Sequence, residues 1–154
     1  MMNENIEIRT MNIEDYEEVM NLWKRIKGFR IRKIDDNYEH IKRFLSRNVG
    51  LSVVAINKGH IVGTILSGHD GRQASFYHVC VDKPYRGLDI AGKMVKAAVD
   101  RLRDEGISKI TLIAYKKNLA GNLFWKNQNW KQNKEINSYE FVLNEENTSD
   151  IIIY

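Results

Sequence analysis

Hydrophobic and polar positions along the chain predict strands and helices that alternate over most of its length. Short apolar or alternating runs favour strands at residues 6–9, 51–56, 61–67, 74–81, 109–115 and 139–143. Apolar residues at spacings of three and four favour helices at residues 12–27, 35–45, 93–105 and 120–127. The polar stretch after residue 144 is expected to be loose, and the apolar end at 151–154 is expected either to add an edge strand or to fray.

The strand at 74–81 and the helix after it are joined by a turn suited to an anion. The turn, Tyr85–Gly92, contains small residues that let a ligand approach the backbone closely. The helix then stops at Gly106, in the usual position for a C-terminal glycine. Because the first N–H groups of a helix are free and its dipole favours negative charge, the turn predicts a phosphate or pyrophosphate site.

The order of the elements predicts an α/β (α+β) domain with a sheet of mixed strand direction. The strands at 51–56 and 61–67 are joined by a short connection that contains Gly59, which favours a tight antiparallel hairpin. The strands at 74–81 and 109–115 flank a crossover helix, so we expect them to be parallel.

Composition narrows the class of protein. With 154 residues, 43% of them hydrophobic, we expect one domain at 1–144 and a tail at 145–154. The single cysteine, Cys80, excludes an internal disulfide and favours a reducing, cytoplasmic setting. No apolar run approaches the roughly 20 residues that cross a bilayer, and residues 1–5 lack the features of a secretory signal. No membrane partner is therefore expected.

Positive charge is concentrated between the first two predicted helices. The net charge is +4, and residues 24–33 hold six cations, Arg30 among them, and no acid. Three interpretations remain open for this segment: a solvated connector, a surface that attracts an anionic acceptor substrate, or a nucleic-acid contact. The last is disfavoured because only Phe29 offers a ring on which a base could stack.

Two motifs compete for the glycine-rich turn. The run Gly87–Lys93 has the P-loop spacing G-x-x-x-x-G-K, but Met94 stands where a magnesium-binding Ser or Thr is required. The same turn resembles motif A of the GNAT superfamily of acyl-CoA N-acyltransferases, [QR]-x-x-G-x-[GA]. Arg86 and Ala91 match that pattern, whereas Asp89 stands at the usual glycine.

A second match lies in residues 118–130, which align without gaps with the family pattern N-x-x-A-x-x-F-Y-x-x-x-G-F. Asn118, Phe124 and Trp130 fit the pattern. Three positions depart from it: Gly121 replaces Ala, Trp125 replaces Tyr and Asn129 replaces Gly. The resemblance covers residues 6–143, and two motifs in the right order are more specific than either alone.

The resemblance implies a GNAT-like mixed, mostly antiparallel sheet with a splayed parallel strand pair and about four flanking helices. It also implies acetyl-CoA as co-substrate, without a metal, and transfer of an acetyl group to a primary amine of a small molecule or protein. The residues it assigns to acetyl-CoA are Val79, Cys80, Val81, Arg86, Gly87, Leu88, Asp89, Ile90, Ala91, Gly92, Asn118 and Trp125. The acceptor amine is expected to enter past the first two helices.

Candidate catalytic residues follow from the chemistry of amide formation. His78 is the best candidate base, because it lies on the strand beside the expected thioester and titrates in the useful range, although it can also serve as a packing residue. His69 and Asp70, in a polar loop, are second candidates for contacts with the acceptor. Tyr115 or water is expected to protonate the leaving thiolate, since Trp125 replaces the usual tyrosine. The N–H of Val81 is expected to hold the oxyanion.

Asp89 places a negative charge at the predicted pyrophosphate site and is expected to weaken its binding. Replacing it by glycine is expected to cost thermal stability, because glycine is a poor helix former. The departures at Asp89 and Trp125 keep a second function open, a non-catalytic acyl-CoA-binding module. Nucleic-acid binding is a third. A homodimer is one of the states that the family resemblance allows.

Overall fold

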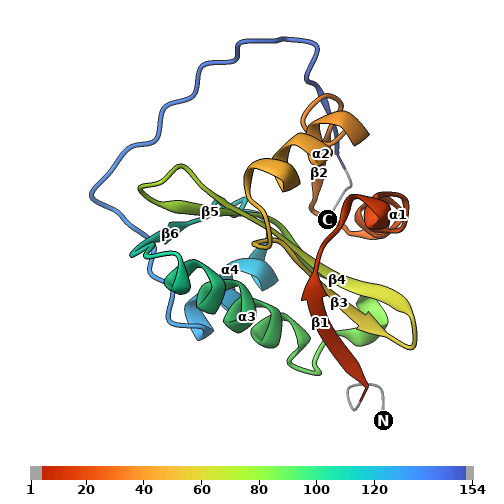
Figure 1. Cartoon of the computed structure of the whole chain (residues 1–154). Coiled ribbons are helices and arrows are strands. Elements are labelled where there is room, and N and C mark those ends of the chain that lie inside the picture. The colour runs from red at the N-terminus through yellow and green to blue at the C-terminus, as the bar shows by residue number, and fades with distance from the viewer. Residues whose placement is uncertain (1–4, 152–154) are drawn as a thin grey trace.

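A computed structural model describes residues 5–151 of the chain. The main sheet has the strand order β1-β3-β4-β5-β6 (Figure 1), built from β1 (Ile6–Thr10), β3 (Val53–Asn57), β4 (His60–His69), β5 (Ala74–Val81) and β6 (Ile110–Thr111). The helices are α1 (Tyr16–Arg25), α2 (Tyr38–Arg47), α3 (Ile90–Asp104) and α4 (Leu119–Asn127), with short 3-10 turns η1 (Ile13–Asp15) and η2 (Lys83–Tyr85). A separate two-stranded sheet joins β2 (Arg30–Arg32) to β7 (Ser149–Ile151).

Helices cover both faces of the main sheet, α3 and α4 on one and α1 and α2 on the other (Figure 1). Strand β3 shows how the sequence achieves this. Val53 and Ala55 pack into the core under α3, whereas Val54 and Ile56 pack into the core under α1 and α2. Because successive side chains of a strand point to opposite faces, a continuous apolar run fills both cores.

The direction of the strands confirms the predicted mixed sheet. Neighbouring strands are antiparallel except β5 and β6, which are parallel. The hairpin between β3 and β4 turns at Lys58 and Gly59, which have φ angles of 49° and 81°. Positive φ at both central residues matches the right-handed twist of the flanking strands.

Strands β5 and β6 separate soon after they meet. Only Ala74 and Ser75 pair with β6, opposite Ile110 and Thr111, so β6 is shorter than the predicted strand at 109–115. Beyond this point the two segments diverge, and the second half of β5 has a free edge facing the chain that leads to α4. This is the splayed parallel pair of the expected fold.

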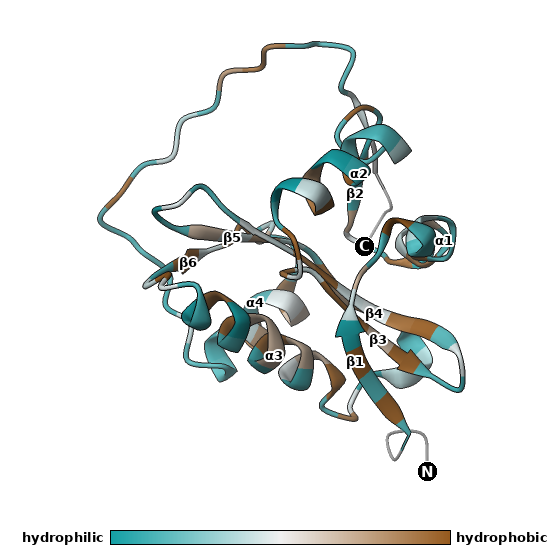
Figure 2. Cartoon of the chain, in the orientation of Figure 1, coloured by the Kyte–Doolittle hydropathy of each residue, from teal (hydrophilic) through white to brown (hydrophobic). Residues whose placement is uncertain are grey.

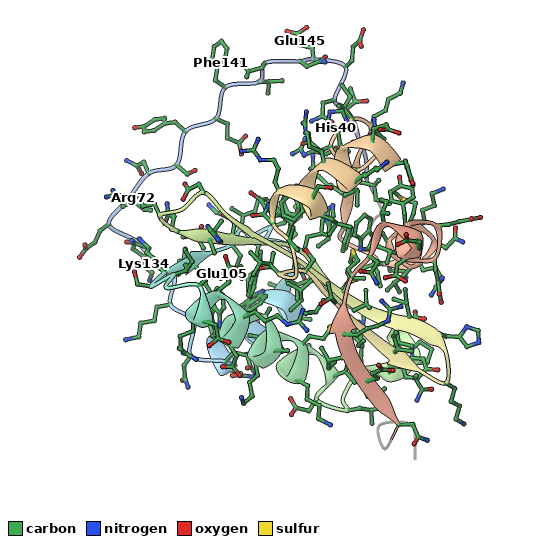
Figure 3. The ribbon with its side chains drawn as sticks, viewed as in Figure 1. His40, Arg72, Glu105, Lys134, Phe141 and Glu145 are labelled. Carbon is green, nitrogen blue, oxygen red and sulfur yellow. The ribbon has the colours of Figure 1, made fainter. Side chains whose placement is uncertain are left out.

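The predicted strand at 139–143 is wrong. Residues 131–148 hold no helix or strand and form an arch away from the rest of the molecule (Figures 1 and 2). Phe141 and Glu145 both lie on this arch (Figure 3), and Phe141 is 88% exposed. The alternation of apolar residues favours a strand, but a strand also needs a partner edge, and within residues 5–151 no strand pairs with the arch.

The chain returns from the arch to the α2 side of the molecule. Strand β7 pairs with β2, which the sequence did not predict as a strand. The side-chain oxygen of Asn147 accepts the N–H groups of Ile34 and Asp35, and its amide donates to the Asp35 carboxylate. Residues 147–150, expected to be loose, therefore hold the connection between β2 and α2. Ile151, for which an edge strand was one of two expectations, lies in β7, and residues 152–154 lie outside the described part of the chain.

Helix boundaries differ slightly from the predicted ones. Helix α2 begins at Tyr38 rather than at residue 35, because Asn37 caps it by accepting the N–H of His40. Helix α1 ends at Arg25. Within residues 5–151, none of the helices has the length and apolar character that crossing a membrane requires.

Candidate active site

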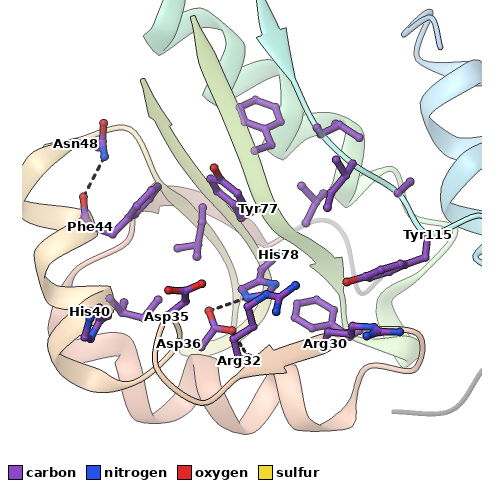
Figure 4. Close-up of a pocket in the computed structure, with 18 of the residues that line it drawn as sticks. Arg30, Arg32, Asp35, Asp36, His40, Phe44, Asn48, Tyr77, His78 and Tyr115 are labelled. Atoms are coloured by element: carbon purple, nitrogen blue, oxygen red, sulfur yellow. Dashed lines mark hydrogen bonds and ion pairs between the residues drawn. The ribbon is translucent and has the colours of Figure 1, made fainter. Parts of the chain in front are cut away.

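A cavity of about 640 Å³ opens on the α2 side of the sheet, between α2, β2, the middle of β5 and the segment after β6 (Figure 4). This volume suits a small ligand. Several of the residues expected in the site line it, from distant parts of the chain: Arg30, His78, Val79, Tyr115, Asn118 and Trp125.

A bulge in β5 sets the position of His78. Thr64 pairs with Cys80 and Leu66 with Tyr77, so β5 has one more residue than β4 between these pairs. At the bulge His78 adopts a φ of 50°, a conformation that costs a residue other than glycine roughly 1–3 kcal/mol. Strict alternation would turn His78 away from its neighbour Tyr77. The bulge instead places both side chains in the cavity on the α2 side.

Buried polar contacts hold the bulge in place. The Thr64 hydroxyl donates to the carbonyl of His78 at 2.8 Å and accepts the indole N–H of Trp23 at 3.0 Å. Both Thr64 and Trp23 are fully buried. The Phe29 ring stacks on the His78 ring with centroids 4.5 Å apart, and the Trp23 ring meets it at a tilt of 53° with centroids 4.6 Å apart. Trp23 and Phe29 also contact each other, with centroids 6.2 Å apart, so the three rings form one cluster that restricts the His78 ring.

Asp36 orients the His78 ring. Its Oδ1 lies 2.8 Å from His78 Nε2 (Figure 4), and its Oδ2 accepts the backbone N–H of Arg32 at 2.6 Å. The carbonyl of Asp36 accepts the Tyr16 hydroxyl at 2.7 Å. Burial and, after it, the charge of Asp36 raise the pKa of Tyr16, so Tyr16 stays protonated and donates. Since a carboxylate only accepts, His78 carries its proton on Nε2, which leaves Nδ1 free to take another.

The edge of β5 beyond the bulge presents backbone groups to the gap beside β6. Asp82 donates its N–H to the Val62 carbonyl of β4, and Val81 lies opposite Gly63. Because hydrogen-bonded and non-bonded pairs alternate in an antiparallel ladder, the N–H and C=O of Val81 point away from β4. The carbonyl accepts Nε of Arg86 at 3.0 Å, which leaves the N–H for a ligand.

The start of α3 has the free donors that the sequence predicted. The first backbone bond of the helix runs from Lys93 N to Asp89 O, and the N–H groups from Gly87 to Gly92 have no partner among the described residues. Gly87 has a φ of 81°. Met94, which stands at the magnesium position of the P-loop pattern, is fully buried in the core. The turn can therefore bind an anion through backbone groups.

Comparison with known proteins identifies the family. The family model described as "Acetyltransferase (GNAT) family" matches residues 16–130 of this chain. The chain belongs to the GNAT acetyltransferase family.

Solved structures agree with this assignment. An acetyltransferase of the GNAT family from Staphylococcus aureus Mu50 is 26% identical, with a TM-score of 0.72 over 80% of this chain and 82% of its own. Two structures of lower identity support the fold alone. An aminoglycoside acetyltransferase from an uncultured soil metagenomic sample, in complex with sisomicin, is 18% identical (TM-score 0.72; 94% and 100% covered). The PaiA N-acetyltransferase of Thermoplasma acidophilum, in complex with coenzyme A, is 16% identical (TM-score 0.68; 80% and 87% covered).

Asp89, where the GNAT pattern has glycine, adopts a left-handed conformation with a φ of 60°. This explains the usual glycine, which accepts that conformation without strain. The Asp89 carboxylate folds over the first turn of α3, and a Cβ at Gly92 would overlap its Oδ1. The carboxylate therefore lies over the N–H groups that are free to bind an anion, rather than turning away from them.

We expect Asp89→Asn to tighten coenzyme A binding several-fold at low salt and by less at high salt, because it removes a negative charge from a phosphate site.

Asp89→Gly should bind coenzyme A at least as tightly as the parent protein. The sequence-based expectation that glycine would cost thermal stability does not follow from this geometry. Glycine adopts a φ of 60° without the strain that aspartate has there, so the melting temperature of Asp89→Gly should stay level or rise. Calorimetry at two salt concentrations and thermal unfolding measure both effects. Unchanged affinity of both variants at low salt would show that the carboxylate does not face the phosphates.

His69 and Asp70, expected near the acceptor, do not line the cavity. His69 Nε2 lies 2.9 Å from Glu105, and its Nδ1 accepts the N–H of Gly71. The Asp70 carboxylate accepts the backbone N–H groups of Gln73 and Arg72, which lower its pKa. Both residues stabilise the β4–β5 hairpin instead.

Cys80 follows the bulge but faces the core under α1. Burial raises the pKa of its thiol to about 12, although a hydrogen bond with Thr64 acts in the opposite direction. A thiol with such a pKa is protonated at neutral pH and does not act as a nucleophile.

Tyr115 and Trp125 lie on the side of the cavity away from α2. Tyr115 is 36% exposed, and Arg30 stacks over its ring with the guanidinium carbon 4.9 Å from the ring centroid. Trp125 packs against Trp130 with ring centroids 4.7 Å apart. Asn118 caps α4 by accepting the N–H of Gly121 at 3.0 Å. Tyr115 therefore supplies the aromatic hydroxyl group on this side of the cavity (Figure 4).

Sequence reasoning missed Asp36 and Thr64. Asp36 is separated from His78 by 42 positions, and its neighbours suggested only the start of a helix. Thr64 lies inside the predicted strand at 61–67, and the sequence-based interpretation assigned it no role. An isolated hydroxyl in a fully buried run was the available signal, because a buried hydroxyl needs a hydrogen-bond partner.

Proposed function

We propose that the protein is an N-acetyltransferase that moves the acetyl group of acetyl-CoA to a primary amine by direct attack. The observation that carries the proposal is the pair of His78 and Asp36, held in a cavity beside the splayed strands of a GNAT fold. A histidine packed against two aromatic rings and oriented by a buried carboxylate has the arrangement of a general base.

The residues present fit coenzyme A. The free N–H groups at the start of α3 would take the pyrophosphate, and the exposed edge of β5 at Val81 would take the amides of the pantetheine arm. Val79, Asn118 and Trp125 line the part of the cavity that adjoins the gap. The T. acidophilum protein, which is similar in fold, was solved in complex with coenzyme A, and this supports coenzyme A as the ligand.

The base is needed because an alkylamine with a pKa of about 10.4 is almost entirely protonated at pH 7, and losing that proton costs roughly 4–5 kcal/mol. His78 would take the proton at Nδ1, and Asp36 would stabilise the imidazolium that forms. The acetyl thioester supplies the electrophilic carbonyl carbon. The ammonium group would first lose one proton to His78, and the neutral nitrogen would then form a bond to that carbon while the carbon–sulfur bond breaks. The second proton, which the nitrogen loses as the amide forms, would pass to water.

The chain offers groups that could stabilise the two negative charges of the reaction, one on the thioester oxygen during attack and one on the departing sulfur. The N–H of Val81 would stabilise the oxygen that becomes negative during attack. The departing thiolate would take a proton from Tyr115 or from water, since the indole of Trp125 is not an acid. A thiol with a pKa near 8.5 can also leave as the thiolate at modest cost.

The alternative of a non-catalytic acyl-CoA-binding module keeps one observation in its favour, the packing of Trp125 where the family pattern has tyrosine. Steady release of free thiol from acetyl-CoA in the presence of varied amines separates the two. We expect amine-dependent release, and calorimetry in EDTA should give undiminished coenzyme A binding. Binding without release for every amine would favour the module, and tighter binding of magnesium–ATP than of coenzyme A would overturn both.

A further inference from the structure

Four arginines line the part of the cavity that β2 and α2 form. Arg30 and Arg32 come from β2, where alternation places them on one face, and Arg43 and Arg47 come from α2, one turn apart. The acids in the same lining are Asp35 and Asp36. Four cations and two acids leave a net charge of +2 on the wall, with the histidines taken as neutral.

These arginines are not neutralised within the described part of the chain. Among the side chains described for residues 5–149, no carboxylate lies within ion-pair distance of Arg30, Arg32, Arg43 or Arg47, whereas Arg9, Arg25 and Arg103 each have such a partner elsewhere. The two acids of the wall already have partners. Asp36 accepts from His78 and from the Arg32 backbone, and Asp35 accepts the Asn147 amide.

The arrangement has a cost that a ligand would repay. Like charges four residues apart on a helix destabilise it, and Arg43 and Arg47 are such a pair. A concave site lined by one sign of charge concentrates its field and raises the local concentration of the opposite charge. A carboxylate matches the paired donors of a guanidinium better than any neutral group.

The position of the arginines in the cavity decides whether they would contact coenzyme A or the acceptor amine. The groups suited to coenzyme A lie at β5, α3 and α4, whereas the arginines come from β2 and α2. Arg32 lies by Asp36 and His78, and Arg30 stacks over Tyr115 (Figure 4). An amine positioned at His78 would direct the rest of its structure toward the arginines. The charge of the wall therefore acts on the acceptor.

We propose that the acceptor is a primary amine of amino-acid size that carries one or more carboxylates, bound through the arginines of β2 and α2. This inference rests on the proposed acetyl transfer and names its substrate class. A polycation such as the sisomicin bound by the similar soil enzyme has the wrong charge for this wall.

The test compares an amino acid with its carboxamide in the thiol-release assay. The two amines have nearly the same shape, but only the acid carries a carboxylate. Forming the amide lowers the pKa of the amine and makes it more reactive, so a preference for the acid must come from recognition. We expect at least a tenfold higher kcat/KM for the acid, falling as salt is raised. Aspartate and glutamate extend the series, and phosphoethanolamine distinguishes a phosphate group from a carboxylate.

Arg43→Gln and Arg47→Gln should each raise the KM for the acid several-fold, and the double variant at least tenfold, with little change for the carboxamide. Lys42→Gln is the matched control, because it removes a cation from the same helix outside the cavity. A carboxamide or an aminoglycoside used as well as the acid would overturn the inference while leaving acetyl transfer intact.

If the proposed acetyl transfer is wrong, the outcome differs from the one that would overturn the substrate class alone. If no amine releases thiol, binding of glutamate to the coenzyme A complex is measured by calorimetry. Binding that the double arginine variant abolishes would keep the anion site and reject catalysis. Absence of binding would reject the anion site as well.

Discussion

We expect kcat to fall by roughly 10²-fold when His78 is replaced by alanine. The physical reason is the loss of the group that takes the proton of the attacking amine, and general-base catalysis contributes about this factor. The KM for acetyl-CoA should change little, because His78 lies on the acceptor side of the cavity. Initial rates across a pH series measure the effect, and the variant should regain activity as the pH rises and more of the amine is neutral.

His78 adopts a left-handed backbone conformation, so the choice of substitution affects folding as well as chemistry. Asparagine tolerates that conformation better than alanine and cannot act as a base at neutral pH. His78→Asn should therefore fold as well as the parent and lose the same activity. If either variant keeps a rate within threefold of the parent at pH 7, His78 is a packing residue only.

The second large effect is expected for Asp36→Asn, which should lower kcat by about as much as removing the ring. One oxygen of Asp36 accepts the backbone N–H of Arg32, so an asparagine that keeps this bond presents its NH₂ group to His78. Nε2 then becomes an acceptor, and the proton moves to Nδ1, the nitrogen that should act as the base. A wrong tautomer loses most of the activity of such a unit even when the geometry is intact.

Asp35→Asn is the matched control, because Asp35 is an adjacent acid of the cavity wall that contacts Asn147 rather than His78. It should retain most of the activity. The double variant His78→Ala with Asp36→Asn should be no slower than His78→Ala alone, since residues that act as a unit are not additive. Additive losses would mean that Asp36 acts independently of His78, and an unchanged rate in Asp36→Asn would remove its positioning role.

Much of the fold was predictable because it depends on local pattern. Alternation and helical spacing located β1, β3, β4, β5 and all four helices, and the motif at residues 85–92 indicated both the anion site and the family. These features need only residues close together in the chain. Glycine at 87 and the first turn of α3 have their free N–H groups whatever surrounds them.

Pairing between distant segments could not be predicted. The run at 139–143 has the alternation of a strand but lies in an exposed arch, whereas Ser149 and Asp150, from the polar stretch expected to be loose, pair with β2 together with Ile151. Strand propensity is a property of a segment, but a strand forms only where another edge is available. The arginines of the basic segment were visible in the sequence, and only the fold shows that two of them face the cavity.

The sequence by itself determined the order of β1, α1 to α4 and β3 to β6, the turn with free N–H groups before α3 and the candidate base at position 78. The tertiary structure decided whether that base could work. The extra residue in β5 turns His78 to the α2 side, Thr64 and Trp23 hold the bulge, and Asp36 meets the ring from 42 positions away. Neither the face of the sheet that a bulged residue takes nor its partner across the chain is encoded locally, because both depend on the packing of α1 and α2 against the sheet.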